Sequence, residues 1–308
     1  MNKHLARLLT VILLFSLIAL PANAQQEPLQ IVATIFPAFD FAREIAGDNA
    51  QVTLLLPPGT DSHSFDPTPQ DILAIQNADL FIYNGGESDV WVARLLESLG
   101  DDAPETFIMM EHVDVCLEAE GHDHHDHDHD HDQLLDEHVW TSPRNVMTIA
   151  QGLTDKLCLI RPELADIFQQ NNAAFQQSLA DLDAALAEVT SNGKRTTLVF
   201  GDRFPFRHLA HAYGLDCHAA FPGCSEDSEP SIKTISSLVK LIREENIPVI
   251  FHIEFSNTQT AGILAEETDA KILLLHSCHT VSQQEIDAGT TYLGLMWQNV
   301  DALKEALN

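Results

Sequence analysis

The feature that most constrains the fold is an alternation of short apolar segments with helical segments, interrupted once by a long amphipathic stretch. In that stretch, at 162–189, apolar residues recur at spacings of three, four and seven. This period indicates a single helix of ~28 residues, about 42 Å long. On both sides of it the alternating pattern predicts a parallel sheet with helices on both faces. We therefore expect an α/β fold with two doubly wound lobes joined by a long rigid helix.

The segments divide the chain into an N-terminal lobe at 25–150, a linking helix at 160–191 and a C-terminal lobe at 195–308. The expected strands lie at 29–35, 51–56, 80–83, 106–110, 197–200, 249–253 and 272–275. The expected helices outside the linker lie at 38–46, 68–78, 88–99, 207–213, 232–245, 258–268 and 300–307. A ligand site is expected in the cleft between the two lobes.

The first residues have the pattern of an export signal. Lys3 and Arg7 precede an apolar stretch at 11–20, and Pro-Ala-Asn-Ala follows at 21–24. Small residues at this place suit a signal peptidase, so a signal peptide is expected over 1–24, with cleavage before Gln25. The apolar stretch is shorter than the ~20 residues that cross a bilayer, and no cysteine lies near the cleavage site. We expect a periplasmic protein without stable membrane insertion or a lipid anchor.

Charge and cysteine content narrow the partners and the compartment. The chain has 16 Lys and Arg against 46 Asp and Glu, a formal charge of −30. Such a field repels nucleic acid and attracts cations. The cysteine count is five, and an odd number in an oxidising compartment leaves at least one thiol outside an internal disulfide. The first pairing to consider is Cys224 with Cys278, because both lie in loop-like contexts of the second half.

A histidine-rich run is the strongest chemical signal. Six histidines alternate with aspartates in a low-complexity segment at 118–133, which has no apolar period and predicts a disordered surface loop. They are His122, His124, His125, His127, His129 and His131. Neutral imidazoles are ligands for zinc and similar metals, so the loop is expected to collect metal ions rather than to form one fixed site. The alternative interpretation is a solvated acidic linker.

Two other histidines stand in segments of a different kind. His63 lies in a proline-rich loop at 57–69, directly after an expected strand, where doubly wound folds place their ligands. His138 lies in Asp-Glu-His-Val-Trp-Thr-Ser-Pro at 136–143, just beyond the histidine run. Taken singly, either residue would more often be an ordinary surface histidine.

Together these segments resemble the zinc and manganese substrate-binding proteins of ABC importers, the cluster 9 family. The resemblance extends over nearly all of 28–308 and rests on several motifs in the same order. Besides 57–69 and 137–140, they are Ile-Val-Ala-Thr-Ile-Phe-Pro at 31–37, Ala-Asp-Leu at 78–80, Tyr-Asn-Gly at 83–85, Tyr-Gly-Leu at 213–215, Glu-Pro-Ser at 229–231 and Thr-Tyr-Leu at 291–293. The family implies a metal bound between two similar lobes, and a His-rich loop in its zinc-binding members.

The resemblance also implies a ligand set, with two departures. His63 and His138 match the first two family ligands. The usual third ligand is a histidine where this chain has Gly201, and the usual fourth is an acid where it has Leu-His-Ser-Cys-His at 275–279. His276 is therefore predicted as the third ligand. The fourth position stays open between Asp202, Glu254, His279 and water, and three imidazoles with an oxygen donor suit Zn²⁺.

The function expected from these features is capture of Zn²⁺ as a transported ligand by a monomeric periplasmic protein, which delivers it to an inner-membrane ABC permease. One alternative is a periplasmic zinc buffer or chaperone that serves no permease. Another is a zinc-dependent hydrolase, against which no HExxH helix or nucleophile–base pair is present in the sequence. No catalytic residue or bound cofactor is predicted.

Overall fold

The structure is a computed structural model that describes residues 27–60, 62, 65–117, 135–221 and 230–308. The expected signal peptide at 1–24, the histidine-rich loop at 118–133, His63 and Cys224 lie outside the described residues. Among the helices that the structure describes, none combines the length and the apolarity needed to cross a membrane.

The N-terminal sheet has four parallel strands in the order β2-β1-β3-β4. The strands are β1 (Leu29–Ala33), β2 (Ala50–Leu54), β3 (Leu80–Tyr83) and β4 (Glu105–Ile108). The two central strands, β1 and β3, are the most apolar, and their side chains are almost completely buried. Continuous apolar sequence is expected where helices cover both faces of a parallel sheet. The covering helices include α2 (Phe36–Ala46), α3 (Pro69–Gln76) and α4 (Val90–Leu99).

The second sheet repeats this topology in the order β6-β5-β7-β8, again fully parallel. The strands are β5 (Thr197–Phe200), β6 (Asp216–Ala219), β7 (Val249–His252) and β8 (Lys271–Leu274), and the helices are α7 (Arg207–Tyr213), α8 (Ile232–Glu245), α9 (Gln259–Thr268), α10 (Gln283–Asp287) and α11 (Tyr292–Leu307). The predicted fold class, two α/β lobes with parallel sheets joined by a long helix, is confirmed. Strand β6 was not predicted, and α11 begins eight residues earlier than the sequence indicated.

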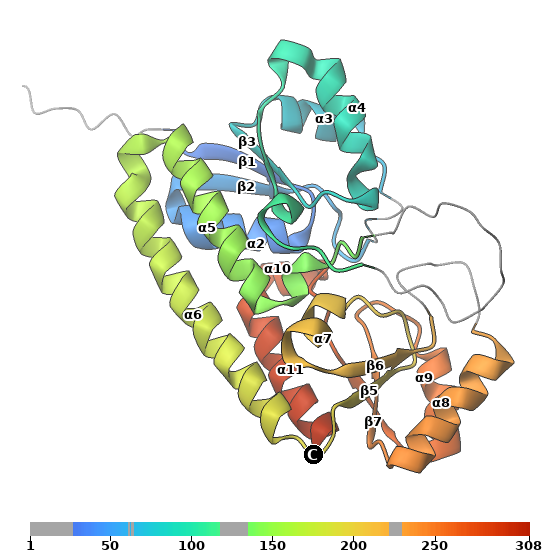
Figure 1. The fold of residues 1–308 in the computed structure, drawn as a ribbon. Coiled ribbons are helices and arrows are strands. Elements are labelled where there is room, and N and C mark those ends of the chain that lie inside the picture. Colours follow the sequence, from blue (N-terminus) through green and yellow to red (C-terminus); the bar gives the residue numbers. More distant parts are fainter. Residues whose placement is uncertain (1–26, 61, 63–64, 118–134, 222–229) are drawn as a thin grey trace, which may run out of the picture.

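The long helix is α6 (Ala165–Asn192), which runs along one side of the molecule past both lobes (Figure 1). It packs against α2 in the first lobe and α11 in the second. Its apolar stripe is fully buried: Phe168, Phe175, Leu179, Leu182 and Leu186. It also packs along α5 (Pro143–Ile160), a helix that the sequence analysis did not predict. The two lobes therefore share one continuous helical support.

The start of α11 is tied to the first lobe. The Asp40 carboxylate on α2 is 1% exposed and accepts a hydrogen bond from the Tyr292 backbone N–H at 2.7 Å. The ring of Tyr292 lies edge-on to Phe41, with 5.1 Å between ring centroids. The hydrogen bond joins residues 252 positions apart in the sequence, and the two contacts fix the two lobes to each other.

Four of the five cysteines lie in the described part of the chain. Cys116, Cys158, Cys217 and Cys278 are free thiols, and Cys278 is fully buried. The expected Cys224–Cys278 disulfide is thus not confirmed, since Cys278 is unpaired and Cys224 lies outside the described residues.

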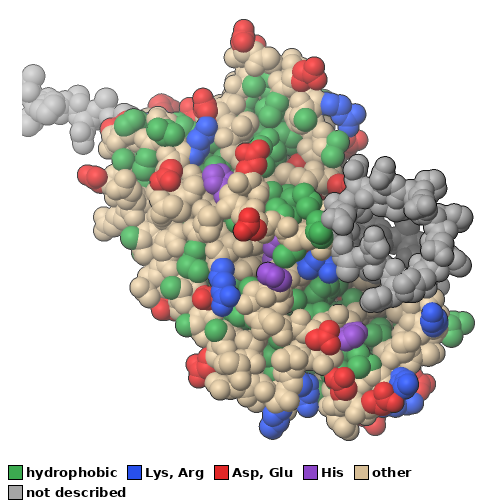
Figure 2. All heavy atoms as spheres, in the orientation of Figure 1, with side chains coloured by type: hydrophobic (Ala, Val, Ile, Leu, Met, Phe, Trp, Pro, Cys, Tyr) green, Lys and Arg blue, Asp and Glu red, His purple; other side chains and the backbone are tan. Residues whose placement is uncertain are grey.

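On the face drawn in Figure 2, acidic and basic side chains are interspersed over both lobes, with Lys and Arg scattered rather than gathered into one patch.

Candidate metal centre

The first half of the candidate site is the segment at 136–141, which is buried and lies just before α5 in the sequence. His138 is 1% exposed, and its ring Nδ1 lies 3.0 Å from Asp136 Oδ1. Because a carboxylate only accepts hydrogen bonds, Nδ1 must carry the proton, and Nε2 is left as a bare nitrogen. A carboxylate on one ring nitrogen and a metal on the other is the usual arrangement of zinc-binding histidines.

Asp136 is itself held from the second lobe. Its backbone carbonyl accepts a hydrogen bond from His208 Nε2 at 2.9 Å, and its Oδ2 lies 3.5 Å from Arg207 Nε. Burial acts to raise the pKa of Asp136, but the hydrogen bonds from His138 and the electrostatic interaction with its ring hold that pKa below its usual value. His208 is buried, and its Nδ1 lies 3.2 Å from Asn145 Nδ2, so its ring is held within the core.

Trp140 links this segment to the second lobe. Its side chain is 1% exposed, and its indole N–H donates to the Ser277 carbonyl at 2.8 Å. The Tyr292 hydroxyl in turn donates to the Trp140 carbonyl at 2.8 Å. The rings of both His138 and His279 lie 5.3 Å from the indole, so Trp140 packs beside both histidines.

The second half of the site is the loop at 275–281, which follows β8. Glu254 organises it by accepting hydrogen bonds from Ser277 N at 2.7 Å, from Ser277 Oγ and from His279 N at 3.3 Å. Cys278 has a φ of 62°, in the left-handed region that residues with a side chain seldom adopt. The resulting tight turn brings the His279 ring to 5.7 Å from the His138 ring, measured between centroids.

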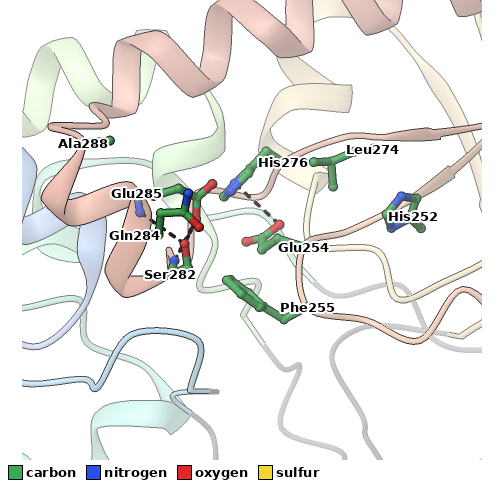
Figure 3. A pocket seen from close by; sticks show the side chains of 9 residues that line it. All are labelled: His252, Glu254, Phe255, Leu274, His276, Ser282, Gln284, Glu285 and Ala288. Atoms are coloured by element: carbon green, nitrogen blue, oxygen red, sulfur yellow. Dashed lines mark hydrogen bonds and ion pairs between the residues drawn. The ribbon is translucent and has the colours of Figure 1, made fainter.

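His276 has a different environment in the same loop. Its backbone is bonded on both sides to Asn299 of α11, and its ring Nδ1 accepts a hydrogen bond from Cys278 N at 2.9 Å. The ring lines a pocket of about 510 Å³ under α10, where it lies toward Glu254, at 3.6 Å, while His252 stands apart from them (Figure 3). Neither His138 nor His279 lines this pocket.

The acidic candidates for a fourth ligand are engaged in structural contacts. Asp202 is 5% exposed, and its two oxygens accept hydrogen bonds from Arg203 N and Ile253 N. Both oxygens of Glu254 are occupied by the turn that it organises. Glu137, next to His138, faces the first lobe, where it accepts hydrogen bonds from Ser88.

The first-lobe loop at 57–69, in which His63 lies, contacts the loop at 275–281 through Gly59. Gly59 N lies 3.0 Å from the Val281 carbonyl and 3.1 Å from Thr280 Oγ1, so the first-lobe loop meets the loop after β8. Gly59 has a φ of 76° and packs against Phe255. His63 itself lies outside the described residues. Within the described part of the chain, no group of three or more His, Cys, Asp or Glu side chains is arranged to hold a metal ion.

Of the predicted residues, the structure thus brings the rings of His138 and His279 together, while His276 turns into another pocket. Sequence reasoning missed the part that Asp136 plays in orienting the ring of His138. A signal was present for Asp136, since a carboxylate two residues before a candidate ligand can orient its ring.

Comparison with known proteins agrees with this architecture. The model of the family ZnuA, zinc-uptake complex component A, periplasmic, matches residues 31–306. The chain belongs to this family. It is 32% identical over 288 residues to the high-affinity zinc uptake system protein ZnuA of Bacillus subtilis, covering 93% of this chain and 90% of that protein.

A second ZnuA-family relative is the zinc-binding lipoprotein AdcA of Streptococcus pneumoniae, 31% identical over 308 residues. The match covers 98% of this chain but only 61% of AdcA. The structure of the Zn(II)-bound ZnuA-like domain of that AdcA superposes with a TM-score of 0.76 at 30% identity, covering 91% of this chain and 99% of the domain. The two-lobed fold is therefore that of the ZnuA family.

Proposed function

We propose that this chain is the extracytoplasmic substrate-binding component of an ABC importer, which captures Zn²⁺ and delivers it to a membrane permease. The observation that carries the proposal is the family match over 31–306, because that family is described by zinc uptake. The family consists of substrate-binding transport proteins rather than a known class of enzyme, and no catalytic residue is needed to explain the cleft.

The chemistry of the cleft favours zinc over manganese. His138 offers a bare Nε2 beside a second imidazole, that of His279, and the nearby carboxylates are bonded to backbone N–H groups. Imidazole nitrogen suits zinc, whereas manganese prefers a shell richer in carboxylate. His63 stays a predicted ligand, His276 is the residue of the second lobe that the sequence predicts, and the histidine-rich loop at 118–133 is the proposed collector that raises the local metal concentration.

The proposal also includes the compartment, the oligomeric state and the partner of the protein. The protein would act as a monomer in the periplasm after removal of residues 1–24, with the permease as its partner. A zinc buffer without a permease would use the same residues, so transport has to be tested separately from binding.

Calorimetric titration with Zn²⁺ and Mn²⁺ tests the binding, on the chain and on a variant lacking 121–132. We expect both to keep one tight zinc site that outcompetes manganese, with only the weaker sites lost in the variant. If tight binding disappears with the loop, the chain is a buffer. Delivery is tested by adding the zinc-loaded chain to the ABC permease of the source organism in vesicles, where it should stimulate ATP hydrolysis and His138→Ala should not.

A further inference from the structure

The two histidines of the loop after β8 have different surroundings, and the ring nitrogen of His276 is used within the loop. A neutral imidazole has one bare nitrogen, and its other nitrogen carries the proton. His276 uses its bare Nδ1 to accept the Cys278 N–H bond, so the proton lies on Nε2. A backbone N–H cannot reverse its role as donor. His276 therefore has no nitrogen for a metal ion unless the bond that closes the turn is broken.

The burial and the backbone hydrogen bonds of His276 are those of a residue that stabilises the loop. It is 4% exposed, and both its backbone N–H and its carbonyl are bonded to the Asn299 side chain. Its ring faces Glu254 and the pocket under α10, which contains neither of the other two histidines (Figure 3). These contacts anchor the loop to α11.

His279 lies at the distance that a shared ion requires. Two imidazoles on a tetrahedral zinc, with Zn–N bonds of about 2.05 Å, would have ring centroids about 5.2 Å apart. The His138 and His279 centroids are 5.7 Å apart, with the ring planes at 77°. A shift of roughly half an ångström reaches the zinc geometry. His279 is also partly exposed, so an ion from solution can reach it, whereas His138 is buried behind it.

The loop holds His279 in this position before any ion arrives. The left-handed backbone at Cys278 makes the turn, and Glu254 accepts hydrogen bonds from both Ser277 and the His279 backbone. On the other side of the cleft, Asp136 fixes the proton of His138 on Nδ1.

We propose that His279, and not His276, supplies the nitrogen ligand of the C-terminal lobe, opposite His138. This rests on the proposed function, since it names a ligand for the zinc that the cleft is proposed to capture. It differs from the prediction made from the sequence, which chose His276 within the stretch 275–279.

The test compares His279→Gln with His276→Asn in the full chain. Asparagine at 276 keeps an oxygen acceptor for the Cys278 N–H, so it serves as the matched control. The dissociation constant of the most tightly bound Zn²⁺ is measured by competition with a chromophoric chelator. His279→Gln is expected to weaken it at least about 100-fold, because even loss of an outer partner of a metal ligand costs about 10–100-fold. His276→Asn should stay within about 3-fold, since it removes no bare nitrogen.

Other results overturn the assignment. If His276→Asn loses the tight zinc site, whether or not His279→Gln also loses it, His276 is a ligand. If His279→Gln keeps the tight zinc site, His279 is not a ligand. Circular dichroism and thermal unfolding of the metal-free variants establish that both fold like the wild type. A wild-type chain that holds no zinc against the chelator contradicts the proposed function itself, so the two failures are distinguishable.

Discussion

Asp40 joins α2 to the start of α11, and replacing it with asparagine should change how stability depends on pH. Its carboxylate is almost completely buried, with Arg43 Nη1 at 3.8 Å and the Tyr292 N–H as its hydrogen-bond donor. Burial raises the pKa of Asp40 to about 7, from an ordinary value of 3.8. The folded chain therefore holds this proton more tightly than the unfolded chain does.

The sign and size of the effect follow from linkage. A raised carboxyl pKa contributes stability at low pH, and that contribution is lost as the pH rises from 3.8 to about 7. The loss is at most about 1.4 kcal/mol per pH unit, and about 2 kcal/mol between pH 5.5 and 8. Asp40→Asn keeps an oxygen for the Tyr292 N–H but does not titrate. Its free energy of unfolding should therefore lack this fall.

Urea unfolding of the metal-free chains, followed by circular dichroism from pH 5.5 to 8, measures the effect. The stability of Asp40→Asn minus that of the wild type should grow by about 2 kcal/mol between pH 5.5 and 8, with most of the rise below pH 7. Asp89, whose pKa burial likewise raises to about 7, titrates in both chains and cancels in the difference. A difference that is constant, or that shrinks as the pH rises, would refute the reasoning.

Three further substitutions test the site and its support. Asp136→Asn should raise the zinc dissociation constant about 10–100-fold in a chelator competition, because His138 loses the carboxylate that fixes its proton; unchanged affinity would contradict this. Trp140→Phe removes the N–H that bonds the Ser277 carbonyl and should lower the free energy of urea unfolding by about 1–3 kcal/mol; a neutral result would show that water replaces the bond. Leu182→Ala, at a fully buried position of α6, should cost about 2–5 kcal/mol of stability in the same assay and leave zinc affinity unchanged, and a selective loss of affinity would argue against a purely supporting helix.

Most of the fold could be read from the sequence, because strands buried on both faces show continuous apolar runs. Strand β6 did not, since its sequence Asp-Cys-His-Ala is polar and the strand lies at a sheet edge. Helix α5 was missed although its apolar residues have helical spacing. The long helix was predicted almost in place, and its start moves to Ala165 because Pro162–Leu164 forms a separate 3₁₀ turn.

The site was less predictable, for a local reason. His276 and His279 are three residues apart, and the direction of each ring depends on the left-handed backbone of Cys278. Nothing in the type of that residue indicates such a conformation, since it is glycine and asparagine that favour it. The tautomers are likewise set by partners, Asp136 for His138 and the Cys278 N–H for His276, whose positions only the folded chain determines.

The position of Trp140 gives this protein an optical reporter of its own cargo. The sequence has three tryptophans; Trp297 is 42% exposed and Trp91 is partly exposed, whereas Trp140 is 1% exposed and lies beside both His138 and His279. An ion held by the proposed ligands His138 and His279 would add positive charge close to this indole and leave the other two in their ordinary surroundings. Loading and release can therefore be followed by emission without any attached dye, and Trp140→Phe assigns the signal.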